Sequence, residues 1–127
     1  MNVLGIGVDI VENGRIATLL EKHGERFLAR VFTDGERTYC SKMRDPAPFY
    51  AARFAAKEAV SKAFGTGIGK DMEWLDIEVR RADSGEPSIV LRGAGAAFAK
   101  TRGVERVLIS LSHTEHYAMA QAMILGA

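Results

Sequence analysis

The hydrophobic pattern of the first third of the chain predicts one strand followed by short helices. Residues 3–11 form a nearly continuous apolar run, which predicts a strand that is buried on both faces for most of its length. Apolar residues then recur at helical spacing between Asn13, a candidate N-cap, and Gly24, a candidate helix end, and a second amphipathic piece follows in ERFLARVF. Thr33 and Glu36 have the spacing of a capping box, which predicts a third short helix over DGERTYCSK.

The rest of the chain predicts one longer helix and two hairpins. Residues 49–64 form an alanine-rich helix, the longest predicted here, and Gly65 closes it. Alternation in LDIEV and in SIVL predicts a first hairpin, and RVLISLS with YAMAQAMIL predicts a second; the short helix GAGAAFAKTRG separates them. This order predicts a single α+β domain over residues 1–127, in which a mainly antiparallel sheet packs against a long central helix.

Composition narrows the class of protein. The chain has 127 residues, of which 47% are hydrophobic and 26% charged, the balance of a globular domain. A net charge of +1 gives no reason to expect a nucleic-acid partner. Cys40 is the single cysteine, so no internal disulfide is possible, and no apolar run is long enough to cross a membrane. We therefore expect a cytoplasmic protein with neither a membrane nor a nucleic-acid partner.

The first strand carries one charge, Asp9, which needs an explanation. An unpaired buried carboxylate is costly, so Asp9 must end the strand, pair with a cation or hold a metal ion. The glycines at 5 and 7 do not form a dinucleotide-binding fingerprint, because Ile10 stands where that motif needs a third glycine or alanine.

A second concentration of charge lies on the alanine-rich helix. Glu58 and Lys62 are four residues apart and share a helical face, and Arg53 precedes Glu58 by five. This can be an ordinary ion pair on a solvated face, or part of a phosphate site formed with the following GTGIG loop. The helix C-terminus repels anions, so a cation such as Lys62 would have to bind the phosphate. Asp9 and Glu58 are hard oxygen donors that suit Mg²⁺, although their spacing does not establish that they meet.

Four stretches, taken together, resemble a known family. GIGVDIVENGRI, FTDGERTYC, RFAAKEAVSKAFGTGI and ISLSHTEHYAMAQAMI are similar to the motifs of the short bacterial, holo-[acyl-carrier-protein] synthase type of 4'-phosphopantetheinyl transferase. They occur in the family's order and span residues 5–124. The resemblance implies Mg²⁺-dependent transfer of 4'-phosphopantetheine from coenzyme A to a serine of an apo acyl carrier protein, with release of adenosine 3',5'-bisphosphate, in fatty acid biosynthesis.

The resemblance also assigns roles to individual residues. Asp9 and Glu58 match the family's metal ligands, and Lys62 matches a catalytic lysine beside the pyrophosphate of coenzyme A. Four further positions match residues that line or shape the coenzyme A site, namely Arg53, Lys57, Gly65 and His113. The serine proton needs a base; Glu58, directly or through a water, is the first choice, and Asp9 is the alternative. Judged from the sequence alone, His113 fits a purely local structural role better than a role in phosphate binding.

The family resemblance further implies partners. Arg15 matches an arginine that docks the acidic carrier protein, and the neighbouring Lys22 and Arg26 extend a local basic excess that suits such a partner. The family fold implies a homotrimer with active sites between subunits. Two departures are Thr114, where some members carry an acidic residue after the histidine, and Asp71, where glycine is common.

Three other functions remain as alternatives to this interpretation. A related transferase could serve a peptidyl or polyketide carrier, and nothing in the sequence decides between carriers. A non-catalytic carrier-binding module would not need two metal-binding carboxylates. A nucleotide-binding or hydrolysing protein is disfavoured because the usual phosphate-binding fingerprints are missing.

Overall fold

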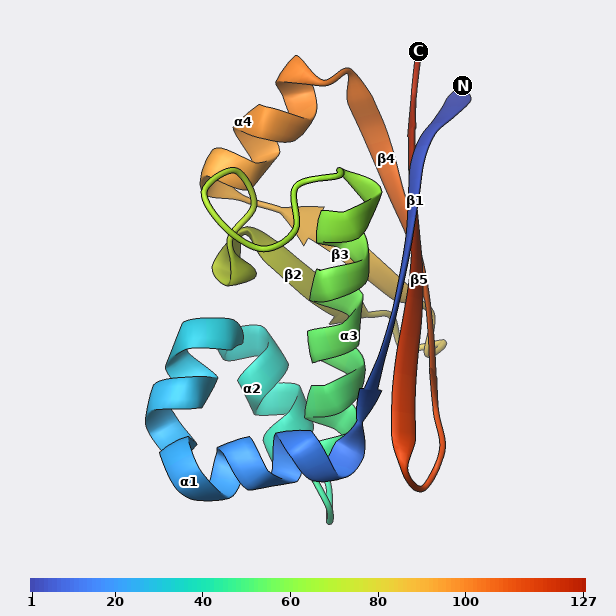
Figure 1. Cartoon of the computed structure of the whole chain (residues 1–127). Helices are drawn as coiled ribbons and strands as arrows, with labels where there is room; N and C mark the ends of the chain where they lie inside the picture. The colour runs from blue at the N-terminus through green and yellow to red at the C-terminus, as the bar shows by residue number, and fades with distance from the viewer.

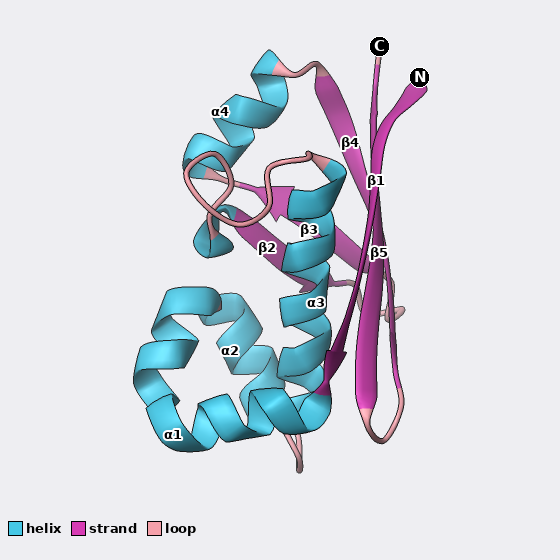
Figure 2. Cartoon of the chain, in the orientation of Figure 1, coloured by secondary structure: helices cyan, strands magenta, loops and turns pink.

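The computed structural model describes all 127 residues and shows a twisted sheet beside a layer of helices (Figure 1). The helices lie on one side of the larger sheet, as in an α+β fold (Figure 2). In chain order, the elements are β1 (Asn2–Glu12), α1 (Asn13–Val31), α2 (Asp34–Ser41), α3 (Ala47–Ala63), the 3₁₀ turn η1 (Trp74–Asp76), β2 (Ile77–Arg81), β3 (Pro87–Leu91), α4 (Gly93–Thr101), β4 (Val104–His113) and β5 (Tyr117–Gly126). None of the helices is both long and apolar enough to span a bilayer.

Both sheets are antiparallel, which confirms the predicted class. The larger sheet has the order β1-β5-β4, so that β1 and β4 are its two edges, and the hairpin of β2 and β3 forms a separate two-stranded sheet. In the larger sheet Asp9 of β1 lies opposite Ala120 of β5, and Ala120 in turn lies opposite Leu111 of β4. The predicted hairpins are both present, and each joins strands that are close in sequence.

The helical region between β1 and α3 agrees with prediction except at its start. Thr33 and Glu36 form the predicted capping box at the beginning of α2. Gly24 does interrupt α1, with φ +46°, and the segments on either side of it are both helical. Asn13, in contrast, is not the N-cap: Glu12 occupies that position, and the Asn13 side chain donates to the carbonyls of Thr114 and Glu115 in the β4–β5 turn.

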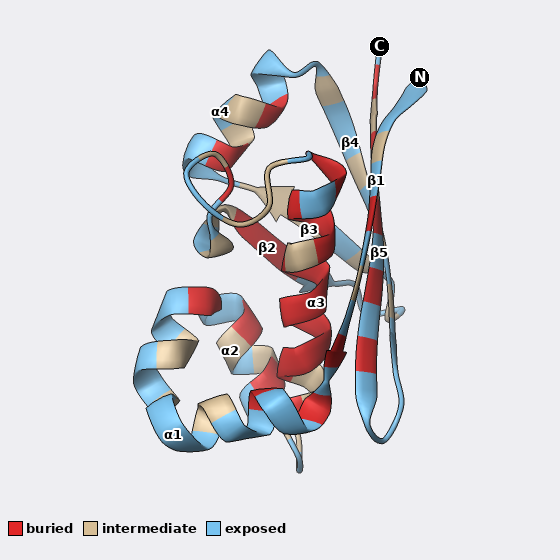
Figure 3. Ribbon diagram, viewed as in Figure 1, coloured by how far each residue is buried: buried red, intermediate tan, exposed pale blue.

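Helix α3 lies against β1 and β5 and is buried over most of its surface (Figure 3). The small alanine side chains of α3 allow the sheet to approach the helix closely, and Ala55, Ala56 and Ala59 are fully buried. Glu58 and Lys62 are exceptions in this helix, because both reach solvent. Glu58 and Lys62 are therefore held on the most buried helix of the fold.

The outer face of β1 differs from the prediction. The sequence predicted a strand buried on both faces, but Ile6 and Ile10 are 62% and 64% exposed, and Val8 is exposed between them. Leu108 and Met119 continue this apolar surface on the neighbouring strands. Helix α3 covers the inner face of the sheet. The outer face of β1 is also apolar, but nothing within a single chain covers it.

Candidate active site

Two glycines in β1 set the distance between this strand and α3. A Cβ atom built on Gly7 would lie 2.0 Å from the carbonyl oxygen of Ala59, and one on Gly5 would lie 2.1 Å from that of Ala63. No side chain fits at either position, so the backbone of β1 rests directly on the helix. This contact places Asp9, two residues after Gly7, beside the last turns of α3.

Asp9, Glu58 and Lys62 gather at this junction of β1 and α3. The Lys62 ammonium donates to Asp9 Oδ1 at 3.0 Å and to the Val8 carbonyl at 3.1 Å. The side chain of Asp9 is only 17% exposed, whereas that of Lys62 is half exposed. The lysine thus pairs with Asp9 on the strand, and the ordinary Glu58–Lys62 pair along the helix that the spacing allowed is not formed.

Of the two carboxylates in this cluster, Glu58 is the one without an ion-pair partner. Burial and the nearby charge of Asp9 raise the pKa of Glu58, while the charges of Lys62 and Arg15 act in the opposite direction. The two carboxylates are thus close enough to repel one another, which a shared divalent cation would relieve. No group of three or more His, Cys, Asp or Glu side chains forms a metal site in the chain. Two carboxylates completed by water and phosphate oxygens are a usual way to bind Mg²⁺, so this donor set fits the ion.

A cavity of about 360 Å³ lies on the other side of α3, between its first turns, the end of β4 and the β2–β3 hairpin. Arg53 and His113, two of the predicted coenzyme A ligands, both line it. The His113 ring lies 5.3 Å from the Phe49 ring. Arg53 is only 6% exposed, and its Nε atom has no hydrogen-bond partner. The Arg53 guanidinium lines the cavity and has no carboxylate partner, so it is suited to binding an anion there.

These two groups of residues do not form one continuous site within a chain. Asp9 lies on edge strand β1 and His113 on the opposite edge strand β4. Arg53 and Glu58 are five residues apart on α3, and therefore point about 140° away from each other around the helix. One chain thus presents an acidic cluster at one edge of the sheet and a basic cavity at the other.

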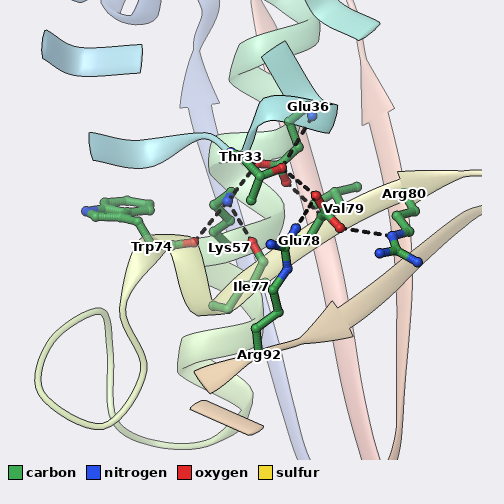
Figure 4. Close-up of polar contacts among 9 residues, drawn as sticks. All are labelled: Thr33, Glu36, Lys57, Trp74, Ile77, Glu78, Val79, Arg80 and Arg92. Atoms are coloured by element: carbon green, nitrogen blue, oxygen red, sulfur yellow. Dashed lines mark hydrogen bonds and ion pairs between the residues drawn. The ribbon is translucent and has the colours of Figure 1, made fainter. Parts of the chain in front are cut away.

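Lys57 occupies a place that the sequence did not predict (Figure 4). Its side chain is 0% exposed and forms an ion pair of 2.8 Å with Glu36, whose side chain is also fully buried. The ammonium donates in addition to the carbonyls of Ile77 at 2.6 Å and Trp74 at 2.9 Å. All three donors of the lysine are therefore used inside the protein. This placement argues against the predicted contact of Lys57 with coenzyme A. Its ion pair and hydrogen bonds instead connect α3 with α2 and with the start of β2.

Glu36 and Glu78 extend this interior network. Glu36 accepts hydrogen bonds from the amides of Thr33 and Val79, at 2.8 and 2.7 Å. Glu78 accepts from the Thr33 hydroxyl at 2.6 Å and also contacts two arginines, Arg80 and Arg92. Burial by itself raises the pKa of Glu78, but the hydrogen bonds from Thr33, Arg92 and Arg80 outweigh it and lower the pKa to about 2.

The low pKa of Glu78 predicts a loss of stability in acid. The ordinary value of 4.5 applies to the unfolded chain, so ionised Glu78 stabilises the fold fully above about pH 4.5, and this contribution disappears as the pH falls towards 2. We expect about 2 kcal/mol, since both arginines are partly exposed and screened by solvent. Urea unfolding of the wild type and Glu78→Gln tests this: the variant is less stable at neutral pH, and the gap narrows near pH 3. A gap that does not change with pH contradicts the assignment.

The glycine-rich loop after α3 caps the C-terminal end of that helix. Gly65 has φ +77°, which favours glycine, and its amide donates to the Lys62 carbonyl at 2.9 Å. The amides of Thr66 and Gly67 both donate to the Ser61 carbonyl. These three amides are thus occupied by carbonyls of the helix, so they are not free to bind a phosphate.

The predicted carrier-docking residues lie on the exposed side of α1. Arg15, Lys22 and Arg26 are all exposed. Arg26 also lines a shallow hollow of about 340 Å³ with Leu19, His23, Phe27 and Arg30. This surface combines positive charge with apolar side chains, and its Arg15 end lies close enough to Glu58 to influence its titration.

The sequence did not predict the other residues of the cavity, which include the aromatic or charged side chains of Tyr39, Phe49 and Arg81. Tyr39 comes from α2, Phe49 from α3 and Arg81 from β2, so no sequence spacing links them. The signal that was available is modest: FTDGERTYC was noted as a family-like motif, and Tyr39 lies within it.

Comparison with known proteins gives a consistent result. Residues 5–122 match the sequence model of the 4'-phosphopantetheinyl transferase superfamily. The chain is 49% identical to holo-[acyl-carrier-protein] synthase of Chlamydia trachomatis serovar L2 over 121 residues, covering 95% of this chain and 98% of the relative. The crystal structure of the holo-[acyl-carrier-protein] synthase from Neisseria meningitidis superposes with a TM-score of 0.91 at 33% identity, covering 98% and 99% of the two chains. That of Helicobacter pylori, in complex with coenzyme A, gives 0.85 at 31% identity, covering 94% and 99%.

Proposed function

This chain belongs to the 4'-phosphopantetheinyl transferase superfamily, and from that premise we propose that it transfers 4'-phosphopantetheine from coenzyme A to a serine of an apo acyl carrier protein. The membership makes the protein an enzyme of the holo-[acyl-carrier-protein] synthase type. The observation that carries the proposal is the meeting of Asp9, Glu58 and Lys62 at the junction of β1 and α3. The cluster combines two carboxylates, either of which can act as a base, with a cation that can stabilise a leaving phosphate.

The residues of the cluster divide the chemistry between them. The serine oxygen attacks the phosphorus that bears pantetheine, and the bond to the bridging oxygen of the diphosphate breaks, releasing adenosine 3',5'-bisphosphate. Glu58 accepts the serine proton, directly or through a water, with Asp9 as the alternative base. Lys62, half exposed, stabilises negative charge on the leaving phosphate. Mg²⁺ held by Asp9 and Glu58 would neutralise charge on the diphosphate.

Coenzyme A also needs a binding site for its adenosine 3'-phosphate. The cavity with Arg53 and His113 supports this role, because it is lined by basic side chains and by no acidic residue. Guanidinium groups bind phosphate oxygens through charge-assisted hydrogen bonds. We assign the nucleotide end of coenzyme A to this cavity and the diphosphate to the Asp9–Glu58–Lys62 cluster.

The separation of these two sites supports a homotrimer with shared active sites. The exposed apolar face of β1, β4 and β5 needs cover in water, and a second copy of the same sheet supplies it. Packing three such sheets around an axis brings the β1 edge of one copy beside the β4 edge of the next. One molecule of coenzyme A then reaches Arg53 and His113 of one chain and Asp9 and Glu58 of its neighbour.

The basic surface of α1 supports docking of an acidic carrier protein. We expect the charge reversals Arg15→Glu and Arg26→Glu together to raise the KM for the carrier by about tenfold or more, because each replaces an attraction by a repulsion. The KM for coenzyme A stays unchanged for Arg26→Glu alone, which is the cleaner variant since Arg15 also acts on Glu58. Steady-state kinetics with each substrate varied measures both values.

A matched control and a salt titration complete this test. Lys100→Glu reverses an exposed charge on α4, on another part of the surface, and leaves both KM values unchanged. The effect of Arg26→Glu also shrinks at high ionic strength. An unchanged carrier KM in both the Arg15→Glu and the Arg26→Glu variants refutes the docking assignment.

One assay tests the proposed function itself. The protein is mixed with coenzyme A, Mg²⁺ and an apo acyl carrier protein, and the intact carrier is weighed by mass spectrometry. A gain of one phosphopantetheine, absent when the acceptor serine is replaced by alanine, supports the transferase. Carrier binding without a mass gain supports a non-catalytic binding module instead. Parallel reactions with fatty-acid, peptidyl and polyketide carriers test our proposal that the enzyme serves fatty acid biosynthesis.

A further inference from the structure

The cavity on the β4 side of α3 contains a second guanidinium that the proposed coenzyme A site does not yet use. Arg81, the last residue of β2, lines the cavity together with Arg53. The guanidinium carbon of Arg53 lies 4.4 Å from the centre of the Tyr39 ring, and that of Arg81 lies 5.6 Å from the same centre. Two cations from different elements are thus held against one aromatic side chain.

Neither guanidinium has an acidic partner. The ion pairs of the chain include Arg37, Arg80 and Arg92, but neither Arg53 nor Arg81 lies within 4 Å of a carboxylate. No acidic side chain lines the cavity, whereas His113 adds a third nitrogen-bearing group. Two cations that line one cavity without a counter-ion make that cavity attractive to an anion.

Arg81 lies against the β2–β3 turn. Gly85 of the turn has φ +95°, and a Cβ atom built there would lie 3.3 Å from Nη2 of Arg81. The guanidinium therefore passes close to the backbone of Gly85. Arg80, the preceding residue, points to the opposite face of the strand, where it pairs with Glu78 at 2.9 Å. The two adjacent arginines of β2 thus have different surroundings: Arg80 pairs with Glu78, and Arg81 lines the cavity.

We propose that Arg81 is a specificity-determining residue that binds the 3'-phosphate of coenzyme A together with Arg53. The inference rests on the proposed function, because it takes the ligand of the cavity to be coenzyme A. A phosphate monoester carries up to two negative charges and three acceptor oxygens, enough to engage two guanidinium groups at once. The diphosphate is bound elsewhere, at Asp9, Glu58 and Lys62, so the loss of Arg81 affects only recognition of the 3'-phosphate.

Isothermal titration of coenzyme A and of 3'-dephospho-coenzyme A into the protein, with Mg²⁺ present, tests the proposal. In Arg81→Ala the Kd for coenzyme A rises by about 10- to 100-fold, the range of one charge-assisted hydrogen-bonded contact. The Kd for 3'-dephospho-coenzyme A stays within about twofold of the wild type. Arg80→Ala removes the same charge one residue away and changes neither value. Arg81 is exposed, so its variant folds, and a matching melting temperature verifies this.

Two results overturn the assignment. Equal weakening of both ligands in Arg81→Ala indicates a general effect on the cavity, and an unchanged Kd for coenzyme A indicates that Arg81 does not touch the ligand. In either case the wild type still modifies the carrier in the mass assay, so only the role of Arg81 fails. If the wild type neither binds coenzyme A nor modifies any carrier, the proposed function fails, and this inference fails with it.

Discussion

The Glu58→Gln variant is expected to transfer phosphopantetheine about 10²- to 10⁴-fold more slowly than the wild type, the usual effect of removing a general base. Glutamine keeps the size of the side chain but cannot accept the serine proton. Glu58 is suited to this role because it is only partly buried and has no direct ion-pair partner, while burial and Asp9 raise its pKa. Turnover at saturating coenzyme A and carrier, measured by the mass gain of the carrier, gives the comparison.

Measuring Mg²⁺ binding distinguishes the two roles proposed for Glu58, metal ligand and general base. Titration of Mg²⁺ in the presence of coenzyme A shows weaker binding in both Asp9→Asn and Glu58→Gln if both carboxylates bind the ion. Excess Mg²⁺ then restores occupancy, but it restores little turnover in Glu58→Gln if Glu58 is also the base. Glu105→Gln, which neutralises an exposed carboxylate on β4, serves as the control and retains full activity. If Glu58→Gln keeps both Mg²⁺ affinity and turnover, the base lies elsewhere.

The Lys57→Met variant is expected to lose about 3–5 kcal/mol of unfolding free energy, the cost of removing one partner of a buried ion pair. Methionine leaves the Glu36 carboxylate without its 2.8 Å partner, and it leaves the carbonyls of Trp74 and Ile77 without a donor. Urea unfolding measures the loss. Lys62→Met is the matched control on the same helix, and because its ammonium is half exposed we expect a change of about 1 kcal/mol or less.

A double variant tests whether the pair is the cause of this loss. Adding Glu36→Gln to Lys57→Met removes the buried charge while keeping a side-chain oxygen for the Thr33 or Val79 amide. We therefore expect the double variant to be more stable than Lys57→Met alone, with a coupling free energy of about 1–3 kcal/mol. A Lys57→Met variant as stable as Lys62→Met refutes the structural role and returns Lys57 to the list of candidate ligands.

The sequence predicted the elements of the fold from local signals alone. The capping box of Thr33 and Glu36, the closing glycine after α3 and the alternation in the hairpins each depend on residues a few positions apart. Such signals act within one turn or one hairpin, and all of them appear in the structure. The exposed side of β1 was missed because its apolar residues are typical of a buried strand, and one chain leaves them uncovered.

Long-range contacts explain what the sequence did not predict about the site. Their chemistry suggested Asp9 and Glu58 as a pair of Mg²⁺ ligands, but no spacing shows that a strand and a helix 49 positions apart meet. The contact between β1 and α3 depends on Gly5 and Gly7. In the sequence these glycines could be recognised only as lacking a nucleotide-binding fingerprint. Lys57 was assigned to coenzyme A from the family resemblance, but it pairs with Glu36, which lies on another helix. A lysine in a helix whose neighbours on nearly every side are alanine is a usable sign of a buried pair.

The central claim is that Asp9 of β1 and Glu58 of α3 bind one divalent ion. A crystal structure of the protein with coenzyme A and Mn²⁺ in place of Mg²⁺, with anomalous data to locate the manganese, tests it most directly. The account predicts a single anomalous peak within coordination distance of both carboxylates and of the coenzyme A diphosphate. Manganese bound away from either carboxylate, while coenzyme A occupies its cavity, would contradict the account.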